Sequence, residues 1–357
     1  MLLGAIASAV AALAPSPTAV GDLRGLYERQ KAADAAVKLN ADAARQRLDS
    51  LATLRGMLPR PVRLEPDDLP VIELSDGRVS ADALRALLAN EACAVHVRGF
   101  MNTQECADIS AALTSDRSAF TNWRINRGVT VGGDETSDDG TTSEVDKIGV
   151  TSGEALESYE RFREYLDPSE RRLEALLPDH LDPFAKLRAE LSEVHPQGCR
   201  LDRLGGFTLP AGTFRCMRGS NGLCHADTAT LLSPAAGEFS ANIYIATPPG
   251  KGNLAVYPAQ QYVGGGPAGL TNPMVIADLQ QLARCQREGY AAAAQDVIRG
   301  ALPCKRSLSL ADGDLVLINT GRFHEVEPYE YDEAEGPRLS GQCWLSYRRE
   351  KPLLMWV

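Results

Sequence analysis

The sequence predicts a mainly β protein, a sandwich or jelly roll with flanking helices. Short apolar stretches separated by turns dominate the chain from Arg200 onward, which is typical of such folds. Most helical patterns come before that point, and a composition of 44% hydrophobic and 24% charged residues is ordinary for a soluble globular protein. At 357 residues the chain is long enough to bury a sizeable core in one large domain or two smaller ones.

The first sixty residues predict a helical extension. Apolar residues recur at roughly helical intervals over 20–58, and the proline-containing stretch 58–70 ends the pattern. We therefore expect an N-terminal helical extension over 1–60 and one further domain over 61–357. The opening run MLLGAIASAVAALAPSPTA imitates a signal peptide but lacks a positively charged start, so a helix is favoured and export remains the alternative.

The next part of the chain alternates strands and helices. PVIEL and CAVHVRGF predict strands, whereas SADALRALLAN, with Ser80 as its N-cap, and NTQECADISAALTS predict helices. Residues 128–153 are rich in Gly, Thr and Asp, which predicts a mobile loop. A helical part follows over about 150–196, with two helical stretches at 154–176 and 182–195.

The β core is expected over about 200–357. Its strands are RLGGFTLPAG, TFRCMRG, ANIYIAT, NLAVYP, SLSL, DLVLINT, HEVEPY and RLSGQCWLSYRR. Residues 259–305 interrupt it with a Gly/Pro-rich loop and one helix, and we interpret them as an insert between two strands.

Charge and cysteine usage narrow the partners. With 37 Lys and Arg against 47 Asp and Glu, the net charge is −10, which argues against nucleic acid and anionic membranes as partners. We expect a small-molecule or protein partner instead. The eight cysteines contain no CxxC pair, which excludes a zinc knuckle and a thioredoxin motif and indicates reduced thiols in a cytoplasmic protein. The oligomeric state is left open.

Three residues are candidate ligands for one metal ion. His225 and Asp227 are two residues apart, and His324 follows an apolar strand much later in the chain. Two imidazoles and one carboxylate on one face of iron(II) leave positions open for a bidentate co-substrate and dioxygen. The same ligands also accept Mn, Co, Ni or Zn, so the triad alone does not select the metal.

A candidate anion site follows the distal histidine. Arg338 and Ser340 begin the strand RLSGQCWLSY, and a spacing of two puts both side chains on one face of that strand. Together they can bind a carboxylate through the guanidinium and a hydroxyl hydrogen bond.

The order His-x-Asp, distal His, Arg-x-Ser resembles the Fe(II)/2-oxoglutarate-dependent oxygenase superfamily, in particular its prolyl-hydroxylase-like members. The resemblance covers about residues 68–110 and 200–357 and implies a double-stranded β-helix (jelly roll, cupin-like) core. It also implies Fe(II) as cofactor and 2-oxoglutarate and O2 as co-substrates. The C-terminal RLSGQCWLSYRREKPLLMWV resembles the branch that hydroxylates or halogenates free amino acids; halogenases replace the carboxylate ligand with Gly or Ala, so Asp227 implies hydroxylation.

The resemblance assigns roles residue by residue. It makes His225, Asp227 and His324 iron ligands, and it makes Arg338 the anchor of the distal carboxylate of 2-oxoglutarate, with Ser340 assisting.

Five further residues are weaker candidates. Asn242 and Tyr244 alternate on ANIYI and can reach the keto acid, although Tyr244 can equally be a core residue. Arg215 and Arg218 are candidates for a substrate carboxylate, with surface pairing as the alternative, and Trp344 is a candidate neighbour of the substrate.

The expected activity is hydroxylation, or another oxidation, of an unactivated C–H bond in a small molecule, with an amino acid or a natural-product intermediate as the substrate. Desaturation, cyclisation and epimerisation remain open, because the same ligands support them. The alternatives are a protein or peptide hydroxylase and a cupin-like metal protein that is not an oxygenase. The acidic run within 134–146 is either a lid or a solvated face, and the latter is favoured.

Overall fold

The computed structural model describes part of the chain: residues 69–115, 121–126, 129–130, 144–148, 177, 181–204, 207–220, 222, 224–225, 237–260, 299, 302, 305–319, 322–348 and 350–357. The expected N-terminal extension, the helix at 154–176 and most of the insert at 259–305 lie outside these residues. Among the described residues, no helix has the length and apolar character needed to cross a membrane.

The centre of the protein is an eleven-stranded sheet, hereafter the main sheet, whose middle strands run in the order β13-β10-β15-β9. All neighbours in this group pair antiparallel. The four strands are β9 (Thr213–Met217), β10 (Gly237–Ala246), β13 (Leu315–Asn319) and β15 (Arg338–Tyr347).

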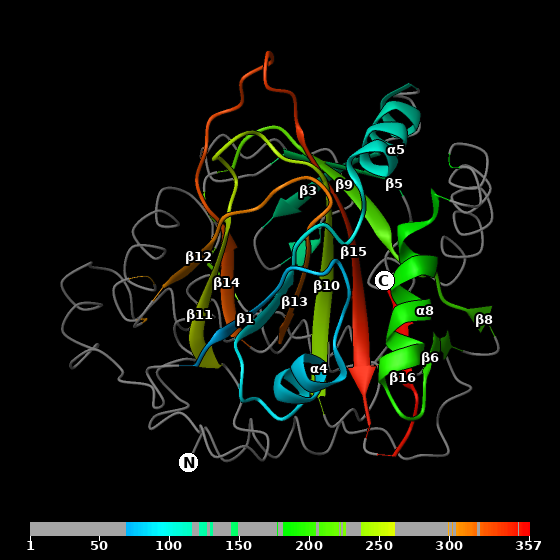
Figure 1. Cartoon of the computed structure of the whole chain (residues 1–357). Coiled ribbons are helices and arrows are strands. Elements are labelled where there is room, and N and C mark those ends of the chain that lie inside the picture. The colour runs from blue at the N-terminus through cyan, green and yellow to red at the C-terminus, as the bar shows by residue number, and fades with distance from the viewer. Residues whose placement is uncertain are drawn as a thin grey trace.

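A second, three-stranded sheet faces the main sheet. It has the order β12-β11-β14 and consists of β11 (Leu254–Gln260), β12 (Arg306–Leu308) and β14 (Arg322–Val326). Apolar side chains of both sheets form one buried cluster, in which Val316 and Ile318 of β13 meet Leu254 and Val256 of β11. Two sheets packed in this strand order form the expected jelly-roll core, a double-stranded β-helix (Figure 1).

Three helices cover the outer face of the main sheet. They are α4 (Ala81–Leu88), α5 (Thr103–Ser115) and α8 (Pro183–Val194). The side chain of Ser80 accepts a hydrogen bond from the backbone N–H of Ala83 and caps α4, as predicted, and Asp182 caps α8 in the same way. Strand alternation then sends one set of side chains to the helices and the other to the space between the sheets.

The two edges of the main sheet are built from other parts of the chain. At one edge β2 (Ala94–Val97) pairs antiparallel with β13 and parallel with β1 (Val71–Leu74), as the expected PVIEL and CAVHVRGF strands. At the other edge β5 (Glu144–Ile148) pairs with β9 and with β3 (Thr121–Asn126), which also pairs with β4 (Val129–Thr130).

The expectation of a mobile loop over 128–153 is wrong for residues 129–130 and 144–148, which are strands. The segment EVDKI is polar in composition, but its backbone pairs with the otherwise open edge of β9. Register places Lys147 opposite Arg215 and Ile148 opposite Phe214, so Ile148 joins the core under the helices.

Four short strands differ from the expectation. Strand β16 (Leu353–Trp356) at the C-terminus pairs with β15 and with β6 (Cys199–Leu201), and all four of its residues are buried. The expected strand RLGGFTLPAG is a small hairpin of β7 (Arg203–Leu204) and β8 (Phe207–Thr208).

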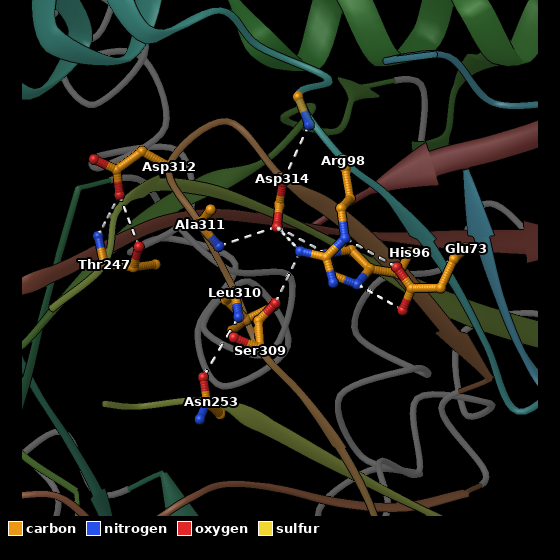
Figure 2. A network of polar contacts seen from close by, with 11 residues as sticks. Glu73, His96, Arg98, Thr247, Asn253, Ser309, Leu310, Ala311, Asp312 and Asp314 are labelled. Atoms are coloured by element: carbon orange, nitrogen blue, oxygen red, sulfur yellow. Dashed lines mark hydrogen bonds and ion pairs between the residues drawn. The ribbon is translucent and has the colours of Figure 1, made fainter. Parts of the chain in front are cut away.

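A buried polar network joins β2 to the turn before β13 (Figure 2). Asp314, whose side chain is 2% exposed, accepts hydrogen bonds from His96 Nε2 at 2.8 Å and from the backbone N–H groups of Gly99 at 3.1 Å and Ala311 at 3.0 Å. Glu73 on β1 contacts the other ring nitrogen of His96 at 3.1 Å. Burial raises the pKa of Asp314, but these hydrogen bonds outweigh it and hold the pKa below its ordinary value.

Replacing Asp314 by Asn should destabilise the fold. The amide removes the charge and turns an N–H donor toward the N–H groups that Asp314 now satisfies. We expect a loss of about 2–4 kcal/mol in the free energy of unfolding, measured by urea denaturation at neutral pH. The control is Asp312→Asn, because Asp312 is exposed and its hydrogen bonds among the described residues go to Thr247, and this change should cost less than about 1 kcal/mol.

The same residue predicts a pH dependence. A carboxyl with a lowered pKa in the folded state contributes stability above its unfolded pKa and loses it as the pH falls through the folded value. The wild-type protein should therefore have a larger free energy of unfolding than Asp314→Asn at neutral pH, and this difference should shrink as the pH falls below the ordinary carboxyl range. A difference in the free energy of unfolding that stays constant through that range would contradict this role for Asp314.

Candidate functional site

The candidate site lies between the two sheets, on the inner face of the main sheet. Along β15 the residues Leu339, Cys343 and Leu345 pack into the core under the helices. Alternation places Arg338, Ser340, Gln342 and Trp344 on the opposite, inner face. Polar side chains of β15 thus line the interior of the β-helix.

The structure brings His225 and His324 together. The two residues form an antiparallel bridge, with the N–H of His225 bonding the carbonyl of His324 at 3.0 Å and the reverse bond at 2.7 Å. Their ring centroids are 4.4 Å apart, although the residues lie far apart in the sequence. His324 Nδ1 lies 2.9 Å from the carbonyl oxygen of Arg322. If that nitrogen donates, the tautomer carries its lone pair on Nε2, as a metal-binding imidazole requires.

The third predicted ligand, Asp227, lies outside the described residues. Within the part of the chain that the structure describes, no group of three or more His, Cys, Asp or Glu residues is placed to hold a metal. The described part of the metal site is therefore the histidine pair.

Arg338 is the most unusual charged group on the inner face. It is 4% exposed, and its Nη1 donates to the sulfur of Met217 at 3.3 Å. Its Nε is buried without a hydrogen bond, and among the described residues no carboxylate pairs with it. Gly252, at φ +61°, allows the β10–β11 loop to pack here, because a Cβ would lie 3.1 Å from Arg338 Cδ.

Arg322 is a second buried arginine of this fold; its Nε also lacks a hydrogen-bond partner among the described residues, but its terminal nitrogens bond oxygen acceptors. It is 0% exposed, and its guanidinium donates to the carbonyl oxygen of Pro258 and to the side-chain oxygen of Asn90. Burial lowers the pKa of Arg322 to about 10, while the nearby Cys93 thiol opposes the shift. Arg338 contacts a thioether instead of oxygen acceptors, so it is placed to receive an anion from outside the chain.

Tyr244 stands beside Arg338. The guanidinium carbon of Arg338 lies 4.9 Å from the ring centroid, and the Tyr244 hydroxyl is buried without a hydrogen bond among the described residues. Burial raises the pKa of Tyr244 despite the opposing charge of Arg338, so the phenol keeps its proton and can donate it to an anion. Ser340 lies directly opposite Tyr244 in the pair of β10 and β15. Asn242, two residues before Tyr244 on β10, lies opposite Gln342.

The histidine pair lies on the Gln342 side of Arg338. The chain runs from β14 to β15 through a turn at one end of the barrel, near the top of Figure 1. Tyr329, in this turn, donates its hydroxyl to the carbonyl of Met217, the residue opposite Arg338. His324 lies on β14, before the turn that holds Tyr329, and Gln342 follows Arg338 on β15. Both residues therefore lie away from the turn.

The weaker substrate candidates separate in space. Arg215 lies on the inner face opposite Ser340, and its guanidinium carbon is 6.0 Å from the ring centroid of Trp344. Trp344 in turn stacks on Trp356 of β16, with centroids 5.4 Å apart. Arg218 follows the end of β9 and is exposed.

Two inner-face residues were not anticipated. Lys147, within the expected loop, is 3% exposed and lies opposite Arg215, and the alternation in EVDKI was its only signal. Gln342 is 5% exposed and shares the parity of Arg338 and Ser340, so the same alternation would have identified it.

A buried cluster lies behind the histidine pair. Glu325, next to His324 and 1% exposed, accepts hydrogen bonds from Tyr257 at 2.8 Å and from Arg299 Nε and Nη2 at 3.0 and 2.8 Å. Arg299 Nη2 also donates to the carbonyl of Gly222 at 2.8 Å. Burial lowers the pKa of Arg299, but the bond and charge of Glu325 more than offset it and raise the pKa. Arg299, within the expected insert, thus links both segments that carry the histidines.

Replacing Arg299 by Ala should leave Glu325 buried without its cationic partner. We expect a loss of about 3 kcal/mol in the free energy of unfolding, measured by chemical denaturation. The control is Lys251→Ala, which removes a surface ion pair to Glu335 at 2.6 Å and should leave the free energy of unfolding nearly unchanged. Equal losses in the two variants would show that Arg299 is not a buried link.

Comparison with known proteins gives the following results. No protein-family model matches the chain, and no curated protein matches it. Among solved structures, the non-heme alpha ketoglutarate dependent epimerase SnoN from nogalamycin biosynthesis is 17% identical over 75% of this chain and 86% of its own, with a TM-score of 0.39. An N-substituted L-amino acid dioxygenase from Burkholderia ambifaria AMMD is 14% identical over 78% and 91%, with a TM-score of 0.44.

A third similar structure is an oxidoreductase of the 2OG-Fe(II) oxygenase family from Burkholderia pseudomallei. It is 14% identical over 79% of this chain and 98% of its own, with a TM-score of 0.40. These proteins belong to the class of enzyme that the sequence motifs resemble. Since all three TM-scores are below 0.5, the chemistry proposed below rests on the residues of this chain.

Proposed function

We propose that the protein is a non-haem Fe(II)/2-oxoglutarate-dependent dioxygenase that hydroxylates, or otherwise oxidises, an unactivated C–H bond of a small molecule. The observation that carries the proposal is a buried arginine that bonds a thioether and no carboxylate among the described residues, together with a pair of adjoining histidines. A protein that only binds a metal has no use for such a guanidinium, which argues against the cupin-like alternative.

The donor set fits the proposed groups. His225 and His324 supply two imidazoles, and Asp227 would supply the carboxylate that completes a facial triad for iron(II). Arg338 supplies an Nε–H and Tyr244 an O–H that have no hydrogen-bond partner among the described residues, and Ser340 lies beside them. When bound, iron and 2-oxoglutarate would supply, with O2, the oxidant that removes hydrogen from the substrate carbon.

The protein's own contribution is to orient and to exclude water. Arg338 and Tyr244 would hold the distal carboxylate of 2-oxoglutarate, so that the keto acid end reaches the histidine pair. The cluster of Tyr257, Arg299 and Glu325 supports the backbone on either side of that pair. Because the co-substrate and the metal ligands are held in fixed positions, the reactants lose less entropy on reaching the transition state.

The polar and charged side chains of the interior support the proposed substrate class. An interior lined by Arg215, Lys147 and Trp344 suits a small polar molecule, an amino acid or a natural-product intermediate. Where the substrate carbon lies relative to the iron would decide between hydroxylation, desaturation, cyclisation and epimerisation.

Replacing Arg338 by Ala should remove the anchor of 2-oxoglutarate. We expect the affinity of the iron-loaded protein for 2-oxoglutarate, measured by calorimetry without oxygen, to fall by about 100-fold or more, because a buried charge-assisted pair is lost. Arg78→Ala is the control, because this exposed arginine pairs with Glu193 on the surface and should leave the affinity unchanged. Unchanged binding in Arg338→Ala would overturn the assignment.

Removing one of the proposed iron ligands should abolish iron binding. The variants His324→Ala and Asp227→Ala should each retain far less iron per chain than wild-type protein after gel filtration, measured by metal analysis, and should release no succinate from 2-oxoglutarate. His195→Ala is the control, because His195 caps the C-terminal end of α8 and is not a proposed ligand. Full iron content in Asp227→Ala would contradict the proposed triad.

A further inference from the structure

The inner face holds a second pair of buried polar atoms, beyond the proposed co-substrate site. Gln342 is 5% exposed, and its Oε1 is buried without a hydrogen bond among the described residues. Trp344 Nε1 is likewise buried without a partner. The two side chains are neighbours on one face of β15, one an acceptor and the other a donor.

The described side chains on either side of Gln342 do not satisfy its Oε1. Gln342 lies between Thr213 on β9 and Asn242 on β10 in the strand register. Thr213 donates its hydroxyl to the carbonyl of Ile148 at 2.7 Å, and the Asn242 amide donates to Ser240 at 3.4 Å. A buried acceptor without a partner costs free energy, so the site is built for a ligand that supplies the missing hydrogen bond.

The position of the pair indicates substrate rather than co-substrate. Going along β15 from the turn near Tyr329, Arg338 and Ser340 come first, and Gln342 and Trp344 follow. The keto acid would occupy the stretch from Arg338 to the histidine pair. Gln342 and Trp344 lie on the same side of Arg338 as the histidine pair, so a group bound to them would lie next to the keto acid end, where a substrate has to be placed.

The chemistry of the pair selects the ligand. Gln342 Oε1 accepts a hydrogen bond, so it suits an ammonium or amide N–H. Trp344 Nε1 donates one, and the nearby guanidinium of Arg215, with Lys147 opposite it on β5, favours an anionic acceptor. Trp344 is held in place by stacking on Trp356, whose own Nε1 donates to Ser346 at 2.9 Å.

We propose that Gln342 and Trp344 form the substrate subsite and that they recognise the ammonium and the carboxylate of an α-amino acid. This inference rests on the proposed oxygenase function, since it places the amino acid next to bound 2-oxoglutarate. Gln342 and Trp344 are then specificity-determining residues, and Arg215 adds positive charge on the carboxylate side.

The test uses full-length protein with iron(II) and 2-oxoglutarate bound. The twenty common L-amino acids are the probes, scored by stimulated succinate release and by calorimetric binding without oxygen. For the best responder, the matching acid without the amino group and the matching amine without the carboxylate should each bind at least about tenfold more weakly. If no amino acid binds or stimulates turnover, the inference is overturned.

The variants then assign the contacts. Gln342→Leu should lower the affinity for the responding amino acid by about 10-fold to 100-fold, while the affinity for 2-oxoglutarate stays at the wild-type value. Gln342→Glu keeps an acceptor and should restore much of that affinity. Trp344→Phe, which keeps a ring but removes the N–H, should weaken binding in the same direction, and Tyr331→Phe on the exposed surface is its control.

The outcomes separate this inference from the proposed function. Retained 2-oxoglutarate binding in Gln342→Leu also shows that the variant is folded, and Trp344→Phe provides the second variant if it is not. The subsite assignment would be overturned if the amino-acid affinity were unchanged in both variants, or if the affinity for 2-oxoglutarate fell by the same factor as the amino-acid affinity. Failure of wild-type protein to bind 2-oxoglutarate at all would instead refute the oxygenase proposal on which the subsite depends.

Discussion

A guanidinium removed from water must find an anion or a set of oxygen acceptors, and the interior of this fold is organised around one that has neither within the described chain. Arg338 is 4% exposed and bonds a thioether. The free-energy cost of burying a charge in this way is several kcal/mol. A protein retains such a group where a ligand completes it, and a dicarboxylate that bridges to a metal at the adjoining histidines meets that requirement.

The rest of the fold sets the geometry of this arrangement. The eleven-stranded sheet turns its apolar residues toward three helices, which leaves its other face to carry Arg338, Ser340, Gln342 and Trp344. The smaller sheet closes the interior and positions His324 opposite Val256. Behind it, Glu325 and Arg299 tie the two histidine segments together, and Asp314 fastens the outer strands to β13. Buried polar links thus surround the polar interior.

Much of the site could be predicted from the sequence because alternation in a strand is a local property. Arg338 and Ser340 share a face for that reason, and the interval between His225 and His324 suited two strands that return to each other. The same rule would have identified Gln342.

Other features depend on pairing between distant segments, which composition does not reveal. The segment around Lys147 is polar and was interpreted as a loop, yet its backbone completes the edge of β9. Arg299 comes from the insert and finds Glu325 only in the folded chain. The register that sets Gln342 between Thr213 and Asn242 likewise follows from pairing of whole strands.

The central claim is that the buried guanidinium of Arg338 binds the distal carboxylate of a keto diacid, and comparing two ligands tests it most directly. Calorimetry on the iron-loaded wild-type protein, without oxygen, would compare 2-oxoglutarate with 2-oxobutanoate, which keeps the keto acid but lacks the second carboxylate. The account predicts that the diacid binds at least about 100-fold more tightly. Equal affinities for the two ligands would contradict it.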